Sequence, residues 1–220
     1  MKQLSRADHV LRALTTLSLL SVFFYLVSAR YYGASPFWFL NWNLLLAWLP
    51  LIVAWILADY LKDHSWTNWP SVILTLLWLA FLPNSFYLIT DFIHLGYADP
   101  TQTLYYVIML FSFSLNGLLL GFVSLYLLHR ELLRRVQPRL AGAWVALVLL
   151  LCSFAVYLGR YLRWSTWDIL FHPVGVVFDV SNRFIDPGAY GQTFQVTILF
   201  FVFLVSLYFT LWQLTQAAKK

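Results

Sequence analysis

The stretch LAGAWVALVLLLCSFAVYLG, residues 140–159, contains no Asp, Glu, Lys, Arg or His, and an arginine bounds it on either side. Its length of 20 residues matches the roughly 20 that an α-helix needs to cross a hydrocarbon core about 30 Å thick. The run of leucine and valine at 147–151 does not alternate between apolar and polar residues, as the strands of a membrane barrel do. The stretch therefore predicts a transmembrane helix.

Five further stretches also lack charged residues and histidine: 13–29, 31–58, 65–90, 100–128 and 187–218. In hydrocarbon every backbone N–H and C=O has to find a partner within the chain, so each stretch is expected to be helical. The sequence thus predicts an all-α membrane protein, a bundle of about six transmembrane helices, with residues 1–220 as a single polytopic domain. The expected helices cover residues 12–29, 39–60, 70–90, 104–128, 143–162 and 194–215.

The composition of the chain excludes several other classes of protein. Of its 220 residues 61% are hydrophobic and 10% are charged, against roughly 45–50% and 25% in soluble domains. An aromatic content of 20% excludes intrinsic disorder. The single cysteine, Cys152, excludes a disulfide framework and a thiolate metal cluster. The formal net charge of +5 comes from basic residues that lie between apolar runs, and no nucleic-acid-binding motif accompanies them.

Lysine and arginine are unevenly divided between the segments that connect the expected helices. With a cytoplasmic N-terminus, ten of them lie on the cytoplasmic side: Lys2, Arg6, Arg12, Lys62, Arg130, Arg134, Arg135, Arg139, Lys219 and Lys220. The other four lie on the outer side: Arg30, Arg160, Arg163 and Arg183. Because cytoplasmic loops carry the excess of positive charge, both termini are predicted to be cytoplasmic.

The first expected helix also has features of a secretory signal peptide. It has a basic start and ends in Val27-Ser28-Ala29, which resembles a cleavage site. Its apolar stretch is longer than the ~7–15 residues of a signal-peptide core, which favours an uncleaved anchor. Cleavage would leave five spans with the same sidedness.

Polar residues gather near the end of the third expected helix, on the outer side. Pro83 is expected to kink or break this helix, because proline removes a backbone donor and clashes with the preceding turn. Asn84 then lies in the outer leaflet, and Asn43 of the second helix points to the same leaflet. Asp91 and His94 follow with the spacing i, i+3, which places both on one helix face.

A second polar group lies at the outer end of the fifth helix. Arg160 and Arg163 are also spaced i, i+3, and Gly159 permits another helix to approach closely. Ser165 and Asp168 match the capping box of a following helix, which is expected to be a short interfacial helix or a re-entrant segment. Two arginines on the outer side run against the positive-inside bias, which indicates that something on that side retains them.

Together these two groups predict a polar site on the periplasmic side that binds an anionic ligand. Guanidinium groups match phosphate bidentately, so a lipid headgroup or a lipid-linked substrate is the expected ligand. The candidate ligand-binding residues are Asn84, Arg160, Arg163 and Asp168, with Asp168 expected to orient one arginine. The candidate catalytic acid–base pair is Asp91 and His94, and an enzyme of this kind would carry out transfer or hydrolysis on a lipid-linked substrate.

Alternative interpretations stay open at this point. The same charged residues are able to form a structural network that ties helix ends together. A zinc site would use Asp91, His94 and His172, with Asp168 as a further ligand. A small transporter usually places charged groups near the membrane midplane, where this chain has only Asn116. A non-catalytic membrane assembly protein would use both groups as scaffold.

Asn116 precedes a GxxxG pattern formed by Gly117 and Gly121. Such a pattern is typical of a face on which two membrane helices pack closely. An asparagine inside the membrane usually finds a hydrogen-bond partner on a neighbouring helix. We therefore expect these residues to serve packing in the fourth helix.

The two outer groups resemble the signature of a family of uncharacterised bacterial membrane proteins, the domain of unknown function numbered thirteen sixty-one. Residues 81–95 read FLPNSFYLITDFIHL, and the family pattern is Phe-x-Pro-Asn-x-x-Tyr-x-x-Thr-Asp-x-x-His-Leu. Residues 159–168 read GRYLRWSTWD, where the family has Gly-Arg-x-x-Arg-Trp-Asn-Ser-Trp-Asp. Ser165-Thr166 thus replaces Asn-Ser, which keeps a helix-capping residue type. The resemblance implies a polytopic bacterial inner-membrane protein and does not imply a particular activity.

Overall fold

The structure is a computed structural model that describes residues 6–31, 37–97, 100–164, 168–186 and 188–218. The described residues form helices and turns, and no strand occurs among them. In chain order the elements are α1 (Arg6–Tyr31), α2 (Phe39–Tyr60), α3 (Trp69–Tyr87), the 3₁₀-helix η1 (Leu88–Tyr97), the short 3₁₀-helix η2 (Pro100–Gln102), α4 (Thr103–Leu133), α5 (Pro138–Tyr161), α6 (Asp168–Phe171), α7 (Pro173–Ile185) and α8 (Gly191–Ala217).

Within the described residues, six helices are long and apolar enough to cross a membrane: α1, α2, α3 together with η1, α4, α5 and α8. The prediction of an all-α membrane protein with about six spans is thereby confirmed, and the chain is a multi-pass integral membrane protein. Several helices extend beyond the charge-free stretches that predicted them. For example, α4 continues past Arg130 to Leu133, and α5 begins at Pro138, because proline is well suited to the first turn of a helix.

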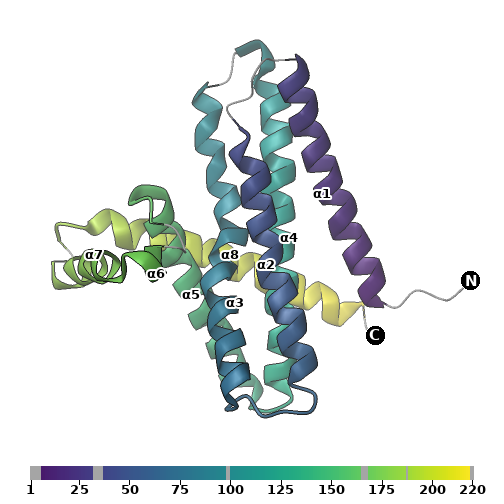
Figure 1. The fold of residues 1–220 in the computed structure, drawn as a ribbon, viewed down its shortest axis with the longest axis vertical. Coiled ribbons are helices and arrows are strands. Elements are labelled where there is room, and N and C mark those ends of the chain that lie inside the picture. Colours follow the sequence, from purple (N-terminus) through teal and green to yellow (C-terminus); the bar gives the residue numbers. More distant parts are fainter. Residues whose placement is uncertain (1–5, 32–36, 98–99, 165–167, 187, 219–220) are drawn as a thin grey trace, which may run out of the picture.

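The helix α4 lies at the centre of the bundle and is the most deeply buried span. It packs against α1, α2, α3, η1 and α5, whereas α8 packs mainly on α5. Figure 1 shows α1 to α4 side by side along the long axis of the molecule, with α8 crossing obliquely behind them and α6 and α7 to one side. The short helices are thus outside the central bundle.

The GxxxG pattern of α4 holds the end of α3 in place. A Cβ atom on Gly117 would lie 2.4 Å from the carbonyl oxygen of Ser85, and one on Gly121 would lie 2.7 Å from the ring of Phe86. Only glycine allows so close an approach of backbone to backbone. The expected packing role of this pattern is confirmed, and the contact lies directly before the start of η1 at Leu88.

Asn116 joins α4 to the first helix. Its Nδ2 donates to Ser18 Oγ over 2.8 Å, and Trp48 Nε1 of α2 donates to the same oxygen over 3.1 Å. The asparagine therefore has the partner on a neighbouring helix that the sequence predicted. Through Ser18 the helix α1 is tied to both α2 and α4, so the first span is part of the bundle.

The third helix does not break at Pro83, contrary to one of the two outcomes expected from the sequence; a bend at that residue stays a prediction. The helix α3 runs through Pro83 to Tyr87, and the tighter 3₁₀ winding begins only at Leu88. Hydroxyl groups bind the carbonyls at this change of winding. Thr90 Oγ1 donates to the Tyr87 carbonyl over 2.6 Å, and Ser114 Oγ donates to the Leu88 carbonyl over 3.0 Å.

The connecting segments gather at two opposite ends of the bundle. At one end Arg135, after α4, donates to the carbonyl of Leu61, after α2. The first turn of α1 and the last turn of α8 line a common apolar cavity of about 630 Å³. At the other end the ring of Phe37, before α2, lies 6.5 Å from the ring of His94 on η1. The candidate site residues belong to this second end.

Candidate functional site

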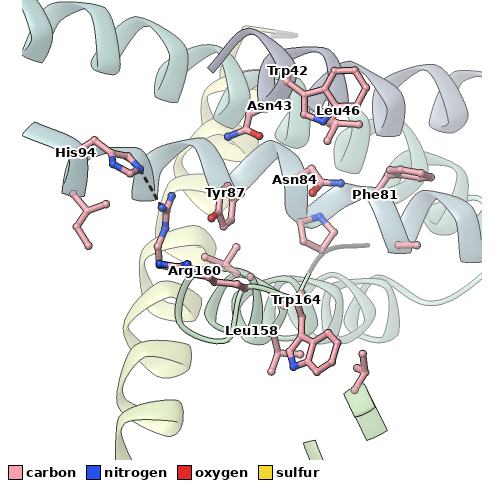
Figure 2. Close-up of a pocket in the computed structure, with 18 residues that line it drawn as sticks. Trp42, Asn43, Leu46, Phe81, Asn84, Tyr87, His94, Leu158, Arg160 and Trp164 are labelled. Atoms are coloured by element: carbon pink, nitrogen blue, oxygen red, sulfur yellow. Dashed lines mark hydrogen bonds between the residues drawn. The ribbon is translucent and has the colours of Figure 1, made fainter. Parts of the chain in front are cut away.

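An open cavity of about 670 Å³ lies between α2, α3, η1, α5 and the start of α7 (Figure 2). The sequence predicted a polar cavity between these same segments. The polar and aromatic residues that line it are Trp42, Asn43, Asn84, Tyr87, His94, Arg160, Arg163 and Trp164. Of the predicted site residues, the structure therefore brings Asn84, His94, Arg160 and Arg163 to one cavity.

The 3₁₀ winding of η1 directs Asp91 and His94 toward the same partner. With three residues per turn, side chains at i and i+3 are eclipsed, so these two residues stack on one face. Asp91 Oδ1 forms an ion pair with Arg160 Nη2, and His94 Nε2 lies 3.5 Å from Arg160 Nη1. Because arginine has only donors, the latter contact is a hydrogen bond when Nε2 carries no proton.

The Asp91 carboxylate lies behind the cavity wall and is fully engaged by neighbouring side chains. It is 1% exposed, and while Oδ1 contacts Arg160, Oδ2 accepts a hydrogen bond from Asn43 Nδ2 over 3.3 Å. A buried carboxylate needs such partners because its charge is costly to desolvate. Asp91 thus holds a neighbouring arginine in place, whereas His94 is the member of the predicted acid–base pair that reaches the cavity.

Arg160 is held by partners on α3 and η1. Its Nε donates to Thr90 Oγ1 over 2.8 Å, and its guanidinium carbon lies 4.3 Å from the centroid of the Tyr87 ring, a cation–π distance. Gly159 makes this approach possible, since a Cβ there would lie 3.1 Å from the Tyr87 ring. Figure 2 shows the Arg160 side chain reaching from α5 to His94.

Arg163 does not share a helix face with Arg160, which corrects the expectation from the spacing i, i+3. The helix α5 ends at Tyr161, and Arg163 has φ 60°, the one left-handed non-glycine residue in the described part of the chain. The N–H groups of Leu162 and Trp164 both reach back to the Leu158 carbonyl, which closes the helix end. Both arginines nevertheless line the same cavity.

The side chain of Arg163 is exposed in the cavity. It forms no ion pair and no hydrogen bond with the residues that the structure describes, in contrast to the clamped Arg160. A left-handed conformation costs a residue with a side chain roughly 1–2 kcal/mol. Arg163 thus has no counter-charge among the described residues, and it occupies a backbone position where glycine would be less costly.

Asp168 lies outside this cavity and lines a shallower one beside it, together with His172. Asp168 Oδ1 is 3.4 Å from His172 Nδ1. The carboxylate that orients Arg160 is thus Asp91, and the expectation that Asp168 plays this part is corrected. Ser165, the other member of the predicted capping box, lies outside the described residues.

The zinc alternative is not supported by the arrangement of its predicted ligands. His172 pairs with Asp168 at the second cavity, whereas Asp91 and His94 face Arg160. Among the residues that the structure describes, no three His, Cys, Asp or Glu side chains are close enough together to hold one metal ion.

Two residues of the site were not assigned a role from the sequence. Tyr87 provides the aromatic face for Arg160, and Thr90 accepts hydrogen bonds from the same guanidinium. The only signal in the sequence is that both lie in the segment 81–95 that resembles the family pattern. Their contacts join segments far apart in the chain, so spacing alone does not reveal them.

The arrangement of the site bears on two alternatives, a structural scaffold and a transporter. Asp91 and Arg160 close on each other, as a structural network would, whereas His94 and Arg163 face an open cavity. This cavity shares no lining residue with the apolar cavity at the opposite end. The fully buried Phe86 lies behind the wall of the apolar cavity, with its ring 5.2 Å from the ring of Phe122, which lines that cavity.

Comparison with known proteins gives a family and no activity. Residues 42–215 match the model of the family described as Protein of unknown function (DUF1361). No curated protein and no solved structure matches the chain. The family match covers most of the chain and includes every residue that lines the cavity, in agreement with the resemblance of the two outer segments. The chain therefore belongs to the family of proteins of unknown function DUF1361.

Proposed function

We propose that this protein is an inner-membrane protein that binds an anionic group of the phosphate class in the cavity between α2, α3 and α5. The observation that carries the proposal is the guanidinium of Arg163, which faces the cavity without a partner among the described residues. A lipid headgroup and a free phosphate are the two sources of such an anion.

The charges around the cavity favour an anion. The positive charge of Arg160 is balanced by Asp91, whereas that of Arg163 has no carboxylate beside it in the described structure. An anion bound at Arg163 would balance its charge, and guanidinium binds phosphate through two parallel hydrogen bonds. A strained residue at such a place is a frequent mark of a functional site.

The remaining site residues have supporting parts in this proposal. Asn84 and Tyr87 line the wall beside the arginines and offer further hydrogen bonds to a ligand. Asp91 positions Arg160, and His94 is the group placed to move a proton at the cavity. If the bound ligand reacts, transfer or hydrolysis at its phosphate-linked bond is the reaction class that these groups suit.

The cavity is proposed to open on the periplasmic side. It lies at the end of the bundle that carries Arg160, Arg163 and Arg183, opposite the turns that carry Arg134 and Arg135. The positive-inside rule assigns the more basic end to the cytoplasm. The start of α1 and the end of α8 are proposed to lie at that basic end, because both line the cavity there.

Binding of a phosphate-bearing probe tests the proposal. Purified protein is titrated with dihexanoyl phosphatidic acid and, separately, with inorganic phosphate, and bound probe is counted by native mass spectrometry. Because hydrogen bonds to charged groups contribute about 1.5–3 kcal/mol, Arg163→Gln is expected to weaken the affinity by about 10- to 100-fold. The matched control is Arg139→Gln, an exposed arginine at the other end of α5, which should bind as the wild type does. Equal affinity in Arg163→Gln and wild type would contradict the proposal.

A further inference from the structure

The walls of the cavity change from polar to apolar along its depth. On α2 the polar Asn43 lies one turn from Leu46, and on α5 Arg160 lies one turn from Val156. All four side chains line the cavity, and in both helices the apolar residue lies toward the membrane interior.

The third wall has the same gradient. On α3 the polar Asn84 and Tyr87 lie near the outer end, and Ala80 and Phe81 lie one to two turns further in. Figure 2 shows Asn84 and Phe81 on this helix, directed into the same space as Leu46 of α2. Three independent helices therefore form a polar mouth above an apolar floor. A free phosphate needs only the mouth, whereas an amphiphile occupies both.

The helix α7 adds Val176 to the cavity wall. It is amphipathic, and its polar face packs on the protein while its apolar face is exposed, the opposite of a helix on the surface of a soluble protein. Gly175, Asp179 and Arg183 are spaced four apart, so they share one face, and this face packs on the protein. A Cβ on Gly175 would lie 3.0 Å from the Trp164 ring, and Trp164 Nε1 donates to Asp179 Oδ2 over 2.8 Å.

Arg183 shows how far the polar face is buried. It is 5% exposed, lies within 4.8 Å of the Tyr190 ring centroid and 6.0 Å of the Tyr157 ring centroid, and is paired with Asp179. A charged residue is seldom so buried unless it is paired. The helix thus turns its charges toward the protein.

The opposite face of α7 is apolar and uncovered. Val174, Val177 and Phe178 are spaced i, i+3, i+4, and Ile185 falls on the same face, three turns after Val174. Val174 and Ile185 are 81% and 79% exposed. At one edge of this face, Phe184 meets Phe154 of α5 and Phe194 of α8, two helices that are themselves membrane spans. The apolar face therefore continues the lipid-facing surface of the bundle.

We infer that α7 lies in the outer leaflet with its apolar face in hydrocarbon, and that the ligand is an anionic membrane lipid which enters the cavity from the side, beside α7. The identity of the ligand rests on the proposed function; the place of α7 does not. The headgroup phosphate would meet Arg160 and Arg163, and an acyl chain would lie along Leu46, Phe81 and Val156.

The first test separates the contribution of the acyl chains to binding from that of the headgroup. Dihexanoyl phosphatidic acid and glycerol phosphate carry the same phosphomonoester, so the inference predicts at least 100-fold weaker binding of glycerol phosphate. Ala155→Phe fills the apolar floor and should weaken binding of the lipid at least tenfold without changing that of glycerol phosphate. The control is Ala143→Phe, on an exposed part of the same helix.

The second test measures what surrounds α7, by spin-label accessibility in lipid nanodiscs. The single native cysteine is buried and is replaced in the background variant Cys152→Ala. A label on Val177→Cys should be accessible to oxygen and shielded from a water-soluble nickel reagent. Leu199→Cys, exposed on α8, gives the reference for lipid, and Asp63→Cys in the α2–α3 turn gives the reference for water.

The outcomes distinguish this inference from the proposed function. Equal binding of lipid and glycerol phosphate, both dependent on Arg163, overturns the inference and leaves the proposed function standing. Failure of all probes to bind overturns the proposed function and the lipid ligand together. A label at Val177 that is accessible to nickel, or shielded from both reagents by a partner protein, overturns the inference that the apolar face of α7 lies in hydrocarbon.

Discussion

Arg160 on α5 forms its ion pair with Asp91 on η1, and the second oxygen of that carboxylate accepts a hydrogen bond from Asn43 on α2. One buried carboxylate thus joins three segments that are distant in the sequence. The pair closes the outer end of the bundle, whereas Arg163 lines the cavity with no ion pair to any residue that the structure describes. Two arginines three residues apart therefore have different roles: Arg160 has a structural role, and Arg163 has the proposed ligand-binding role.

Removal of the Asp91 charge is expected to destabilise the protein. In Asp91→Asn the guanidinium of Arg160, whose side chain is 15% exposed, stays largely shielded from water without its counter-charge, which costs about 3 kcal/mol for a pair of this kind. The measurement is the free energy of unfolding in detergent. The double variant Asp91→Asn with Arg160→Gln should recover part of this loss, because no charge is left unpaired. Wild-type stability of Asp91→Asn would show that the ion pair does not hold the segments together.

Glycine at position 163 is expected to separate stability from binding. Arg163→Gly relieves the left-handed backbone, so the free energy of unfolding should rise by about 1 kcal/mol while affinity for dihexanoyl phosphatidic acid falls. Leu162→Gly is the control, since Leu162 has an ordinary helical φ of −100° and should lose stability. A loss of stability in Arg163→Gly, equal to that of Leu162→Gly, would mean that the Arg163 side chain supports the fold.

The contact between α3 and α4 predicts a contrast between two glycines. Gly117→Ala places a Cβ 2.4 Å from the Ser85 carbonyl oxygen and should cost about 1–3 kcal/mol through overpacking. Gly142→Ala meets nothing within 4 Å and should be neutral or gain up to about 1 kcal/mol from helix propensity. The measurement is the midpoint of thermal unfolding of each variant, which should be lower for Gly117→Ala than for Gly142→Ala. Similar midpoints would mean that α3 does not pack on Gly117.

The proposed orientation predicts which cysteines are labelled from outside the cell. In the Cys152→Ala background, Gly96→Cys near the end of η1 and Ala189→Cys before α8 should react with an impermeant maleimide in intact cells. Asp63→Cys should react only after the membrane is opened. Labelling of Asp63→Cys in intact cells, or protection of either outer position, would reverse the proposed orientation.

The sequence predicted the helices well because hydrocarbon imposes one requirement on every span, that backbone groups pair within the helix. It also located the cavity segments, because charged residues at membrane depth are rare enough to stand out. It predicted the end of the fifth helix to within one residue, at 162 against Tyr161, but not the left-handed backbone of Arg163, since no glycine stands there to mark the turn. The pairing of Asp91 with Arg160, rather than of Asp168 with an arginine, depends on contacts between distant segments that spacing does not encode.

The most direct test of the central claim is an experimental structure of the protein with dihexanoyl phosphatidic acid bound. We expect phosphate oxygens at about 2.7–2.9 Å from the guanidinium nitrogens of Arg163, beside Arg160, with an acyl chain along the apolar floor. A phosphate bound instead at the basic turn that carries Arg134 and Arg135, with the outer cavity empty, would contradict it.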